Sequence, residues 1–571
     1  MSETGSLTMI RKMFLHLSNA HRWQIVLLCI ISFFASLAEI VSIASVIPFL
    51  ALVSGEKSPM LNDMLQRVGL VFDFSEGDQI TSITLIFIST VLVAAAIKIL
   101  MHIFLTNLAA GIGANYGYKL FASHLSRSFL LANMSHSSDA LAAVNKTIEL
   151  VEQFIRPIFV MISSSFLMIS ITSLVVILEP MISISVFIGL SGIYLFIAFY
   201  LRPIVKRKSN FYSQSHDRTV RLLQEGLGST RDIIINGQEK FYTDRLLEIL
   251  VPMHRSLALI KILAGIPRHV IEAFGISVIC FLVLFFNSLD HGIAEVIPIL
   301  GFLALAMHRT LPLMQQTYSS YTSVQGAMGM VKDVLFELER YEARHYGSQS
   351  VSFEKSIVLK EISFKYPNAK TNVLDCYSLT IQKGNKLGLW GHTGSGKSTI
   401  LDILSGLIEP QLGAVFIDGT PLNSQNRLSW MSRLAYVSQS IFLLDRPLLE
   451  NICSNIDEEL INYEHLQACL MAVDLEAVVR NLNNGLRSSI GERGALLSGG
   501  QKQKIGIARA LYRKPDLLIL DEATNAMDAQ TESKVMKGIA ELFPDITLIL
   551  VSHSKSTMKF CDAVVNLNSV R

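Results

Sequence analysis

Long apolar stretches occupy most of the first 330 or so residues of this 571-residue chain. A helix needs about 20 apolar residues to cross a bilayer, and each stretch reaches that length. Charged residues make up only 17% of the chain, against about 25% in ordinary soluble proteins. The sequence therefore predicts six membrane-spanning helices and excludes a wholly soluble or a disordered protein. The predicted spans are Trp23–Val53, Thr84–Ala110, Phe154–Leu178, Met181–Leu201, Leu263–Phe286 and Ile293–Tyr318.

The distribution of Lys and Arg between the loops predicts the orientation. With a cytoplasmic N-terminus, the inner segments 1–22, 111–153 and 202–262 hold three, three and eleven of these residues, whereas the outer segments hold only Lys57 and Arg67. This asymmetry agrees with the positive-inside rule. Six crossings return the chain to the cytoplasm, so we expect the polar C-terminal third to be cytoplasmic. We also expect the two long inner loops to extend the membrane helices into the cytoplasm.

The outer segment Pro59–Leu70 places its apolar residues on one helical face. Two interpretations stay open. The segment is either an interfacial helix on the outer leaflet or a short helix packed within a loop.

Net charge and cysteine usage exclude two classes of function. The formal net charge of +2 is too small to indicate a nucleic-acid-binding protein. The six cysteines are scattered, with no CxxC pair, which favours core thiols over metal ligands or disulfides.

A Gly-rich segment in the C-terminal third predicts a phosphate-binding loop. The predicted strand Lys386–Trp390 leads into the sequence GHTGSGKS at Gly391–Ser398, and a predicted helix, Thr399–Leu407, follows. Glycines let backbone N–H groups surround phosphate oxygens, Lys397 reaches the β- and γ-phosphates, and the Ser398 hydroxyl binds Mg²⁺. The predicted ATP-binding residues of this segment are Gly391, Thr393, Gly394, Ser395, Gly396, Lys397, Ser398 and Thr399.

An acidic pair follows a second apolar strand. Leu517–Leu520 runs directly into Asp521 and Glu522, about 125 residues after the phosphate-binding loop. An apolar strand that ends in carboxylates is the expected partner of such a loop. Asp521 is predicted to hold Mg²⁺, and Glu522 is predicted to polarise the attacking water.

A second phosphate-binding helix start precedes that strand. The residues concerned are Ser498, Gly499, Gly500 and Gln501. Because one phosphate group does not need two such sites in one domain, we expect this site to face the ATP of another copy of the chain.

These three motifs resemble the phosphate-binding loop, the signature motif and the acidic strand of ABC transporter ATPases. Further matches follow in order along the chain. Tyr366 resembles the aromatic residue that stacks on adenine, Gln439 resembles the Q-loop glutamine that joins the Mg²⁺ shell, and Gly491–Gly494 resembles the segment before the signature. Asp528 stands at the D-loop position, and His553 resembles the histidine that contacts the γ-phosphate.

The resemblance covers nearly the whole chain and implies a half-transporter of the ABC exporter type. The expected fold is an all-α six-helix transmembrane domain over residues 1–345, fused to a cytoplasmic α/β ATPase domain over residues 346–571. The resemblance implies a homodimer that binds ATP and Mg²⁺ in composite sites. It also implies coupling through two cytoplasmic segments, near Asn133–Ala143 and at Glu225–Gln238.

Four positions depart from the pattern of the family. Asn525 and Met527 stand where Ser and Leu are usual in the D-loop, Lys504 replaces an Arg after the signature, and Ser554 replaces an Arg after His553. None of these changes removes a catalytic group. We expect them to alter how tightly two ATPase domains close and therefore the rate of turnover.

Charged residues inside the predicted spans are the candidates for substrate contact, because such residues are costly in a membrane and often functional. An alternative role for them is to fix helix packing or to reach the membrane surface. Those predicted to contact substrate are Glu39, Lys98, Arg268, Glu272 and Arg309.

The surroundings of these charges resemble flippases for lipid-linked oligosaccharides, in which cavity-lining basic residues attract a pyrophosphate headgroup. The resemblance rests on Glu39 with Ile47-Pro48-Phe49, Pro267-Arg268 with Glu272, and His308-Arg309 with Pro312. The expected function is therefore ATP-driven translocation of an anionic lipid-linked oligosaccharide or another amphipathic lipid across the bacterial inner membrane. Two alternatives stay open: an exporter of peptides or hydrophobic drugs, and an ATP-gated channel or regulator.

Overall fold

The chain divides into two compact units in this computed structural model. One unit comprises Met1–Arg127 with Ala132–Ala343, and the other comprises Ser128–Leu131 with Arg344–Arg571. The structure describes residues 6–46, 49, 79–126, 129–130, 137–178, 180–287, 293–339, 347, 349–367 and 369–567. The predicted outer helix Pro59–Leu70 lies outside the described residues, as do residues 133–136 of the predicted coupling segment Asn133–Ala143; the rest of that segment lies in a helix that begins at Ser137.

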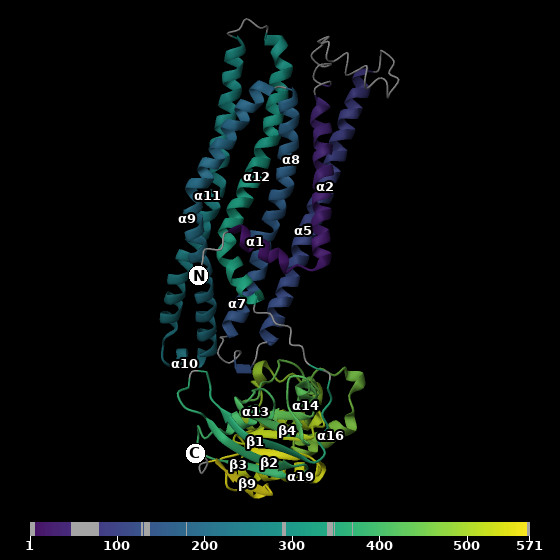
Figure 1. The fold of residues 1–571 in the computed structure, drawn as a ribbon, viewed down its shortest axis with the longest axis vertical. Helices are drawn as coiled ribbons and strands as arrows, with labels where there is room; N and C mark the ends of the chain where they lie inside the picture. Colours follow the sequence, from purple (N-terminus) through teal and green to yellow (C-terminus); the bar gives the residue numbers. More distant parts are fainter. Residues whose placement is uncertain are drawn as a thin grey trace. The chain divides into compact units, whose positions relative to one another are not determined.

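The secondary-structure elements in the described part of the first unit are all helices (Figure 1). Its helices are α1 (Ser6–Leu15), α2 (Asn19–Ala44), α5 (Gln79–Ser126), α7 (Ser137–Leu150), the π-helix η1 (Val151–Ile155), α8 (Arg156–Leu178), α9 (Pro180–Gly228), α10 (Thr230–Ile235), α11 (Glu239–Asn287) and α12 (Ile293–Glu339). Helices α5, α9, α11 and α12 contain 48, 49, 49 and 47 residues. At 1.5 Å per residue each is about 70 Å long, more than twice the hydrocarbon thickness of a bilayer. Helices α5, α9 and α11 thus run from the predicted spans into the predicted inner segments 111–153 and 202–262.

Within the described residues, helices long and apolar enough to cross a membrane cover four of the six predicted spans. They are Asn19–Ala44, Ile83–Ser126, Val144–Ile177 and Glu239–Ser277. The predicted spans Met181–Leu201 and Ile293–Tyr318 lie in α9 and α12, where many side chains lie outside the described part. These two spans are helical and stay predictions as membrane crossings.

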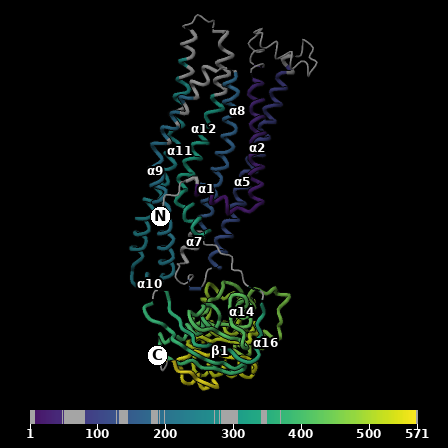
Figure 2. Tube along the Cα trace, in the orientation of Figure 1, coloured from purple at the N-terminus to yellow at the C-terminus, as the bar shows by residue number. Residues whose placement is uncertain are grey.

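The long helices run side by side along the first unit (Figure 2). Helix α2 packs on α5 and α8, α12 packs on α8, and α9 and α11 pack on each other and on α12. Where α7 passes into α8, one π-turn shifts the register, and the Val151 side chain contacts Gly113 on α5 so closely that no Cβ would fit there. Such π-turns occur frequently at functional sites.

The second unit contains two sheets. An antiparallel sheet has the order β2-β1-β4-β5, and a parallel sheet has the order β6-β7-β8-β3-β9. The strands are β1 (Ser356–Phe364), β2 (Leu374–Gln382), β3 (Lys386–Trp390), β4 (Leu412–Ile417), β5 (Thr420–Pro421), β6 (Leu434–Val437), β7 (Leu517–Asp521), β8 (Thr547–Val551) and β9 (Ala563–Asn566). Every residue of β8 and the first four of β7 are buried, as expected for strands covered on both faces of a parallel sheet.

The second unit also contains helices. They are α13 (Lys397–Leu404), α14 (Arg427–Ser432), α15 (Leu448–Ile452), α16 (Tyr463–Ala472), α17 (Glu476–Asn481), α18 (Gly499–Tyr512) and α19 (Ala529–Leu542), with the 3₁₀ turns η2 (Glu458–Leu460), η3 (Gly485–Arg487), η4 (Glu492–Gly494) and η5 (Thr557–Phe560).

The helix after the phosphate-binding loop differs at both ends from the prediction Thr399–Leu407. It begins at Lys397 and ends at Leu404. The earlier end has a local cause, because Gly406 adopts φ +79°, the left-handed conformation that terminates helices.

Candidate functional site

The parallel sheet brings four sequence motifs to one edge. Strands β3, β6, β7 and β8 run in the same direction, so the segments that follow them emerge at the same end of the sheet. Those segments are the phosphate-binding loop after β3, Gln439 after β6, Asp521 and Glu522 at the end of β7, and His553 after β8.

The phosphate-binding loop curls around the side chain of Lys397. Its Nζ atom donates hydrogen bonds to the carbonyl oxygens of Gly391 (2.8 Å) and His392 (3.0 Å). Gly394 and Gly396 adopt φ +86° and +91°, conformations that a residue with a Cβ rarely takes. The Ser395 hydroxyl is buried and has no hydrogen-bond partner among the described residues. The loop thus holds a buried ammonium and an unsatisfied hydroxyl, which suit the oxygens of a phosphate group.

Glu522 lies at the centre of a hydrogen-bonded cluster. His553 Nε2 lies 3.0 Å from its Oε1, and Gln439 Nε2 donates to its Oε2 at 2.8 Å. Asn525 Nδ2 donates to the same Oε2 at 3.0 Å. The backbone of Glu522 has φ +51°, and its N–H group donates to the carbonyl of Val551 at 3.0 Å. A turn of this kind is strained for a residue with a side chain.

Asp521 lies beside two further polar groups. The Tyr436 hydroxyl donates a 2.7 Å hydrogen bond to its Oδ2. Burial raises the pKa of Asp521, although the bond from Tyr436 acts in the opposite direction. Burial, together with the charge of Asp521, raises the pKa of Asp402 on α13 to about 6. The environment is therefore rich in negative charge, a setting that suits a cation.

The signature segment begins α18 with a capping box. Gln501 N–H donates to Ser498 Oγ (3.3 Å), and Ser498 N–H donates to Gln501 Oε1 (2.8 Å). Gly499 and Gly500 pack against Ala526 of the same chain, within the D-loop. The helix start remains exposed, so its N–H groups are open to a ligand supplied from outside the chain.

Two predicted nucleotide contacts have partners of their own. The Tyr366 hydroxyl lies 3.2 Å from Thr399 Oγ1. Asp528 caps α19 by accepting bonds from the N–H groups of Gln530 and Thr531, and hydrogen bonds from Thr531 lower the pKa of its carboxyl group. Lys504, one of the residues that depart from the pattern of the family, forms an ion pair with Asp474, with 2.9 Å between Nζ and Oδ2.

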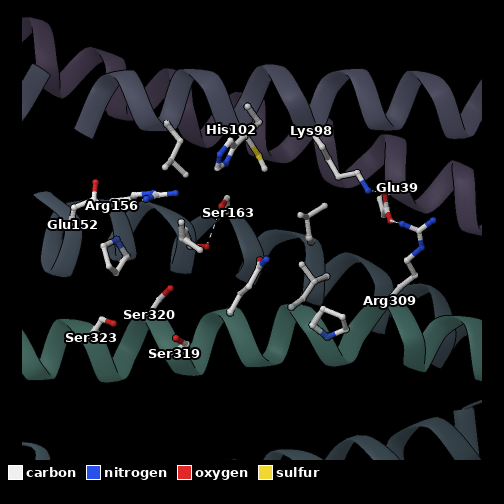
Figure 3. A pocket seen from close by; sticks show the side chains of 18 of the residues that line it. Glu39, Lys98, His102, Glu152, Arg156, Ser163, Arg309, Ser319, Ser320 and Ser323 are labelled. Carbon is white, nitrogen blue, oxygen red and sulfur yellow. Dashed lines mark hydrogen bonds and ion pairs between the residues drawn. The ribbon is translucent and has the colours of Figure 1, made fainter. Parts of the chain in front are cut away.

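In the membrane unit, three of the predicted substrate residues meet (Figure 3). Glu39 on α2 is 5% exposed, and its two oxygens contact Lys98 Nζ on α5 at 2.8 Å and Arg309 Nη1 on α12 at 3.3 Å. All three line a cavity of about 630 Å³. A second ion pair, between Glu152 and Arg156 (2.9 Å), lies at the opposite end of the cavity in the view of Figure 3.

The other two predicted substrate residues lie elsewhere. Arg268 and Glu272 form an ion pair one helical turn apart on α11, with 2.8 Å between Nε and Oε1. They line a cavity of about 770 Å³. This cavity shares His308, Pro312 and Gln316 with the first one, so the two cavities are neighbours, although the two charged groups are separate.

The sequence did not reveal three of these partners: Tyr436 at Asp521, Asn525 as a donor to Glu522, and Glu152 beside Arg156. Tyr436 pairs with Ile519 in the strand register. Since Ile519 and Asp521 lie on the same face of β7, the register would have identified Tyr436. No local signal in the sequence gives that register.

The fold and the sequence match known transporters. Residues 374–525 match the ABC transporter family. The chain is 27% identical over 396 residues to an ATP-dependent lipid A-core flippase of Alkalilimnicola ehrlichii, with 67% of each chain covered. It is 31% identical over 261 residues to an ATP-dependent lipid A-core flippase of Pseudoalteromonas translucida, with 45% of each chain covered.

Among solved structures, a bacterial Atm1-family ABC exporter with ATP bound matches with a TM-score of 0.76 and 17% identity, over 96% of this chain and 94% of that one. This likeness extends the agreement in fold to both units. The chain is therefore a multi-pass membrane protein with the half-transporter fold of ABC exporters, and its ATPase domain is that of an ABC transporter, in which ATP hydrolysis is coupled to transport.

Proposed function

We propose that this chain forms a homodimer in the bacterial inner membrane and translocates an amphipathic lipid with an anionic headgroup, such as a lipid-linked oligosaccharide. The observation that carries the proposal is the cavity in the membrane unit, where Lys98 and Arg309 retain 31% and 38% exposure. Cations that line a cavity at membrane depth mark a path for a charged group. The two relatives described above as lipid A-core flippases support a lipid as the cargo.

ATP would bind at the edge of the parallel sheet. The buried ammonium of Lys397 and the unsatisfied hydroxyl of Ser395 fit the phosphates, and Tyr366 would stack on the adenine. Mg²⁺, held by Ser398, Gln439 and Asp521, would neutralise charge on the phosphates.

Glu522 would then polarise the attacking water, and His553 would contact the γ-phosphate. Both side chains already lie within hydrogen-bond distance of each other.

The exposed start of α18 supports the dimer. Ser498–Gln501 would meet the ATP held by the partner subunit, so that each ATP contacts both chains only in the closed state. ATP would therefore bind the closed state more tightly than the open state, and this difference in affinity would shift the population toward the closed state. Hydrolysis would remove the bridge and let the ATPase domains separate.

A peptide or drug exporter remains the alternative in the same class, and a channel or regulator is the alternative of another class. Because Glu522 is present with both His553 and Gln439 hydrogen-bonded to it, real turnover is expected, which disfavours a purely regulatory role.

The test is ATPase stimulation and lipid translocation in proteoliposomes. We expect stimulation by a polyprenyl-diphosphate-linked oligosaccharide and little by zwitterionic lipid or by peptides. Arg309→Ala should weaken stimulation by the anionic lipid, whereas the matched change Lys240→Ala, at an exposed cation on α11, should not. Stimulation by peptides alone would exclude the lipid, and an unchanged response of Arg309→Ala would exclude the attraction of its headgroup.

A further inference from the structure

A single buried carboxylate holds the two cations of the cavity. Glu39 is 5% exposed, and its oxygens contact Lys98 and Arg309. These cations come from two different helices, α5 and α12, and both are more exposed than the carboxylate between them. Glu39 is therefore the least exposed of the three residues, although all three line the cavity.

Each cation keeps hydrogen-bonding capacity for a ligand. An ammonium has three donors and a guanidinium has five, and the contact with Glu39 uses one nitrogen of each. Their exposed parts line the cavity of about 630 Å³. Serine hydroxyls of α12 (Ser319, Ser320 and Ser323) line the same cavity, as Figure 3 shows. An anionic headgroup would thus meet cations that are already partly neutralised.

We propose that Glu39 is a resident counter-ion that competes with the headgroup for Lys98 and Arg309 and so sets the affinity and charge preference of the cavity. The inference rests on the proposed function, because it assumes an anionic cargo. With Glu39 ionised, Lys98, Arg309 and Glu39 together carry two positive charges and one negative charge, a net charge of +1. An anion held by both cations lies close to the Glu39 carboxylate, and this like-charge contact weakens binding.

This role has a consequence for transport. A site that bound a diphosphate with two free cations would hold it tightly and release it slowly. The internal carboxylate re-forms its two ion pairs when the headgroup leaves, so that the empty cavity does not contain unpaired buried charge. Glu39 thereby favours release as well as moderating capture.

The experiment uses the full-length transporter in nanodiscs. Binding of a polyprenyl diphosphate and of phosphatidylglycerol is measured as thermal stabilisation without nucleotide, and ATPase stimulation is measured in parallel. Glu39→Gln should lower the half-saturating concentration of the polyprenyl diphosphate by about tenfold, with a smaller change for the singly charged phosphatidylglycerol. It should also lower the maximal stimulated rate, because release slows. Glu39→Asp should resemble the wild type.

Glu152→Gln is the matched control, because Glu152 lines the same cavity but pairs with Arg156. It should leave the preference between the two lipids unchanged. Inorganic pyrophosphate, tested in the binding assay, separates recognition of the anion from recognition of the lipid. Stabilisation by pyrophosphate with the same response to Glu39→Gln supports a site for the headgroup alone. If Glu39→Gln changes the binding of the polyprenyl diphosphate but not that of pyrophosphate, the same site is supported, and the lipid chain is required for binding.

A purely structural role for Glu39 predicts another pattern. If Glu39 only positions the cations, Glu39→Gln weakens binding of both lipids or leaves it unchanged, and the proposal is wrong. Should Glu39→Gln fail to fold, the double variant Glu39→Gln with Lys98→Met restores the net charge of +1. Competition predicts that it binds the polyprenyl diphosphate more tightly than Lys98→Met alone, whereas equal or weaker binding contradicts it. If neither lipid binds or stimulates the wild type, it is the proposed function that fails.

Discussion

His553 Nε2 lies 3.0 Å from Oε1 of Glu522, on the turn that follows β7. The second oxygen of Glu522 accepts bonds from Gln439 and Asn525. The carboxylate is thus fixed from three directions by segments that follow β6, β7 and β8. Its φ of +51° adds backbone strain that the surrounding contacts must offset. The Glu522 side chain thus contacts both of the other residues predicted to be catalytic, Gln439 and His553.

We expect Glu522→Gln to abolish turnover and to preserve ATP binding. The amide is isosteric but is no longer a base, and loss of a general base lowers rates by about 100-fold or more. Steady-state ATPase activity and ATP binding are measured on the same preparation. Glu464→Gln, at an exposed position on α16, is the control and should have wild-type activity. Full hydrolysis by Glu522→Gln would contradict the assignment of the base.

Asn525→Ser is expected to raise the rate of hydrolysis a few-fold. The Asn525 amide donates to Glu522 Oε2 at 3.0 Å and so occupies part of the capacity of this oxygen to accept hydrogen bonds. The shorter serine would lose this contact and leave Glu522 Oε2 more open to a hydrogen bond from the attacking water. The measured quantities are kcat and KM for ATP, and KM should not change. Met527→Leu alters the neighbouring D-loop position and is the control; an equal effect of both substitutions would assign the change to domain closure instead.

The ATP-binding motifs at the ends of the parallel strands were predictable from the sequence, because each motif consists of residues that are close together along the chain. An apolar strand, a turn and a helix start can be identified within ten or so residues, and parallel strands bring their ends together whatever their order. The hydrogen-bond and ion-pair partners of the motif residues were not predictable, since these contacts depend on the strand register and on packing between residues far apart in the sequence. Lys504 shows this, because its partner Asp474 lies 30 residues away, in the turn between α16 and α17.

In the membrane unit too, the sequence predicts the helices but not which charged residues contact one another. Apolar length predicts a helix at each span, and the charges Glu39, Lys98 and Arg309 stand out in the sequence. Which charges meet depends on how α2, α5 and α12 are rotated about their axes, and that rotation follows from packing. Arg268 and Glu272 therefore had the same sequence signal as the other three but lie in a neighbouring cavity.

The stability of the ATPase unit should depend on Asp402 in a pH-dependent way. Burial and the charge of Asp521 raise the pKa of Asp402 from 3.8 to about 6 in the folded protein. The folded state therefore binds the proton more tightly than the unfolded state does. The resulting stability is complete below about pH 4 and is lost as the pH rises through about 6, a change on the order of 2 kcal/mol.

Asp402→Asn removes this loss. We expect the variant to have a higher midpoint of thermal unfolding than the wild type at pH 8 without nucleotide, and to show little gain at pH 4. Asp545→Asn, at an exposed position, should have no such pH-dependent effect. An equal change at both pH values would mean that packing of the amide, and not the charge, is responsible.

Lys146 joins three helices of the membrane unit, α7, α9 and α12. It is 4% exposed, and its Nζ lies 2.7 Å from Asp217 on α9 and 2.8 Å from Asp333 on α12. Lys146→Ala would leave these carboxylates without their shared cation and should cost about 2–4 kcal/mol. The exposed pair of Lys12 and Glu339 offers a control, since Lys12→Ala should cost less than about 1 kcal/mol. Thermal unfolding in detergent compares the two variants, and equal midpoints would contradict a structural role for Lys146.

The apolar end of α10 provides a test of coupling. Ile234 and Ile235 are 59% and 70% exposed on this short helix, while Ile233 is buried. Exposed isoleucines next to charged residues favour contact with another surface, and the segment resembles the second coupling segment of exporters. We expect Ile235→Glu to reduce the stimulation of ATPase activity by the lipid to near the basal rate, because a charge there would be desolvated on docking. ATP binding should not change. Thr243→Glu adds the same charge at an exposed position nearby on α11, and it should retain stimulation. If both variants are stimulated alike, α10 does not transmit the signal in this protein.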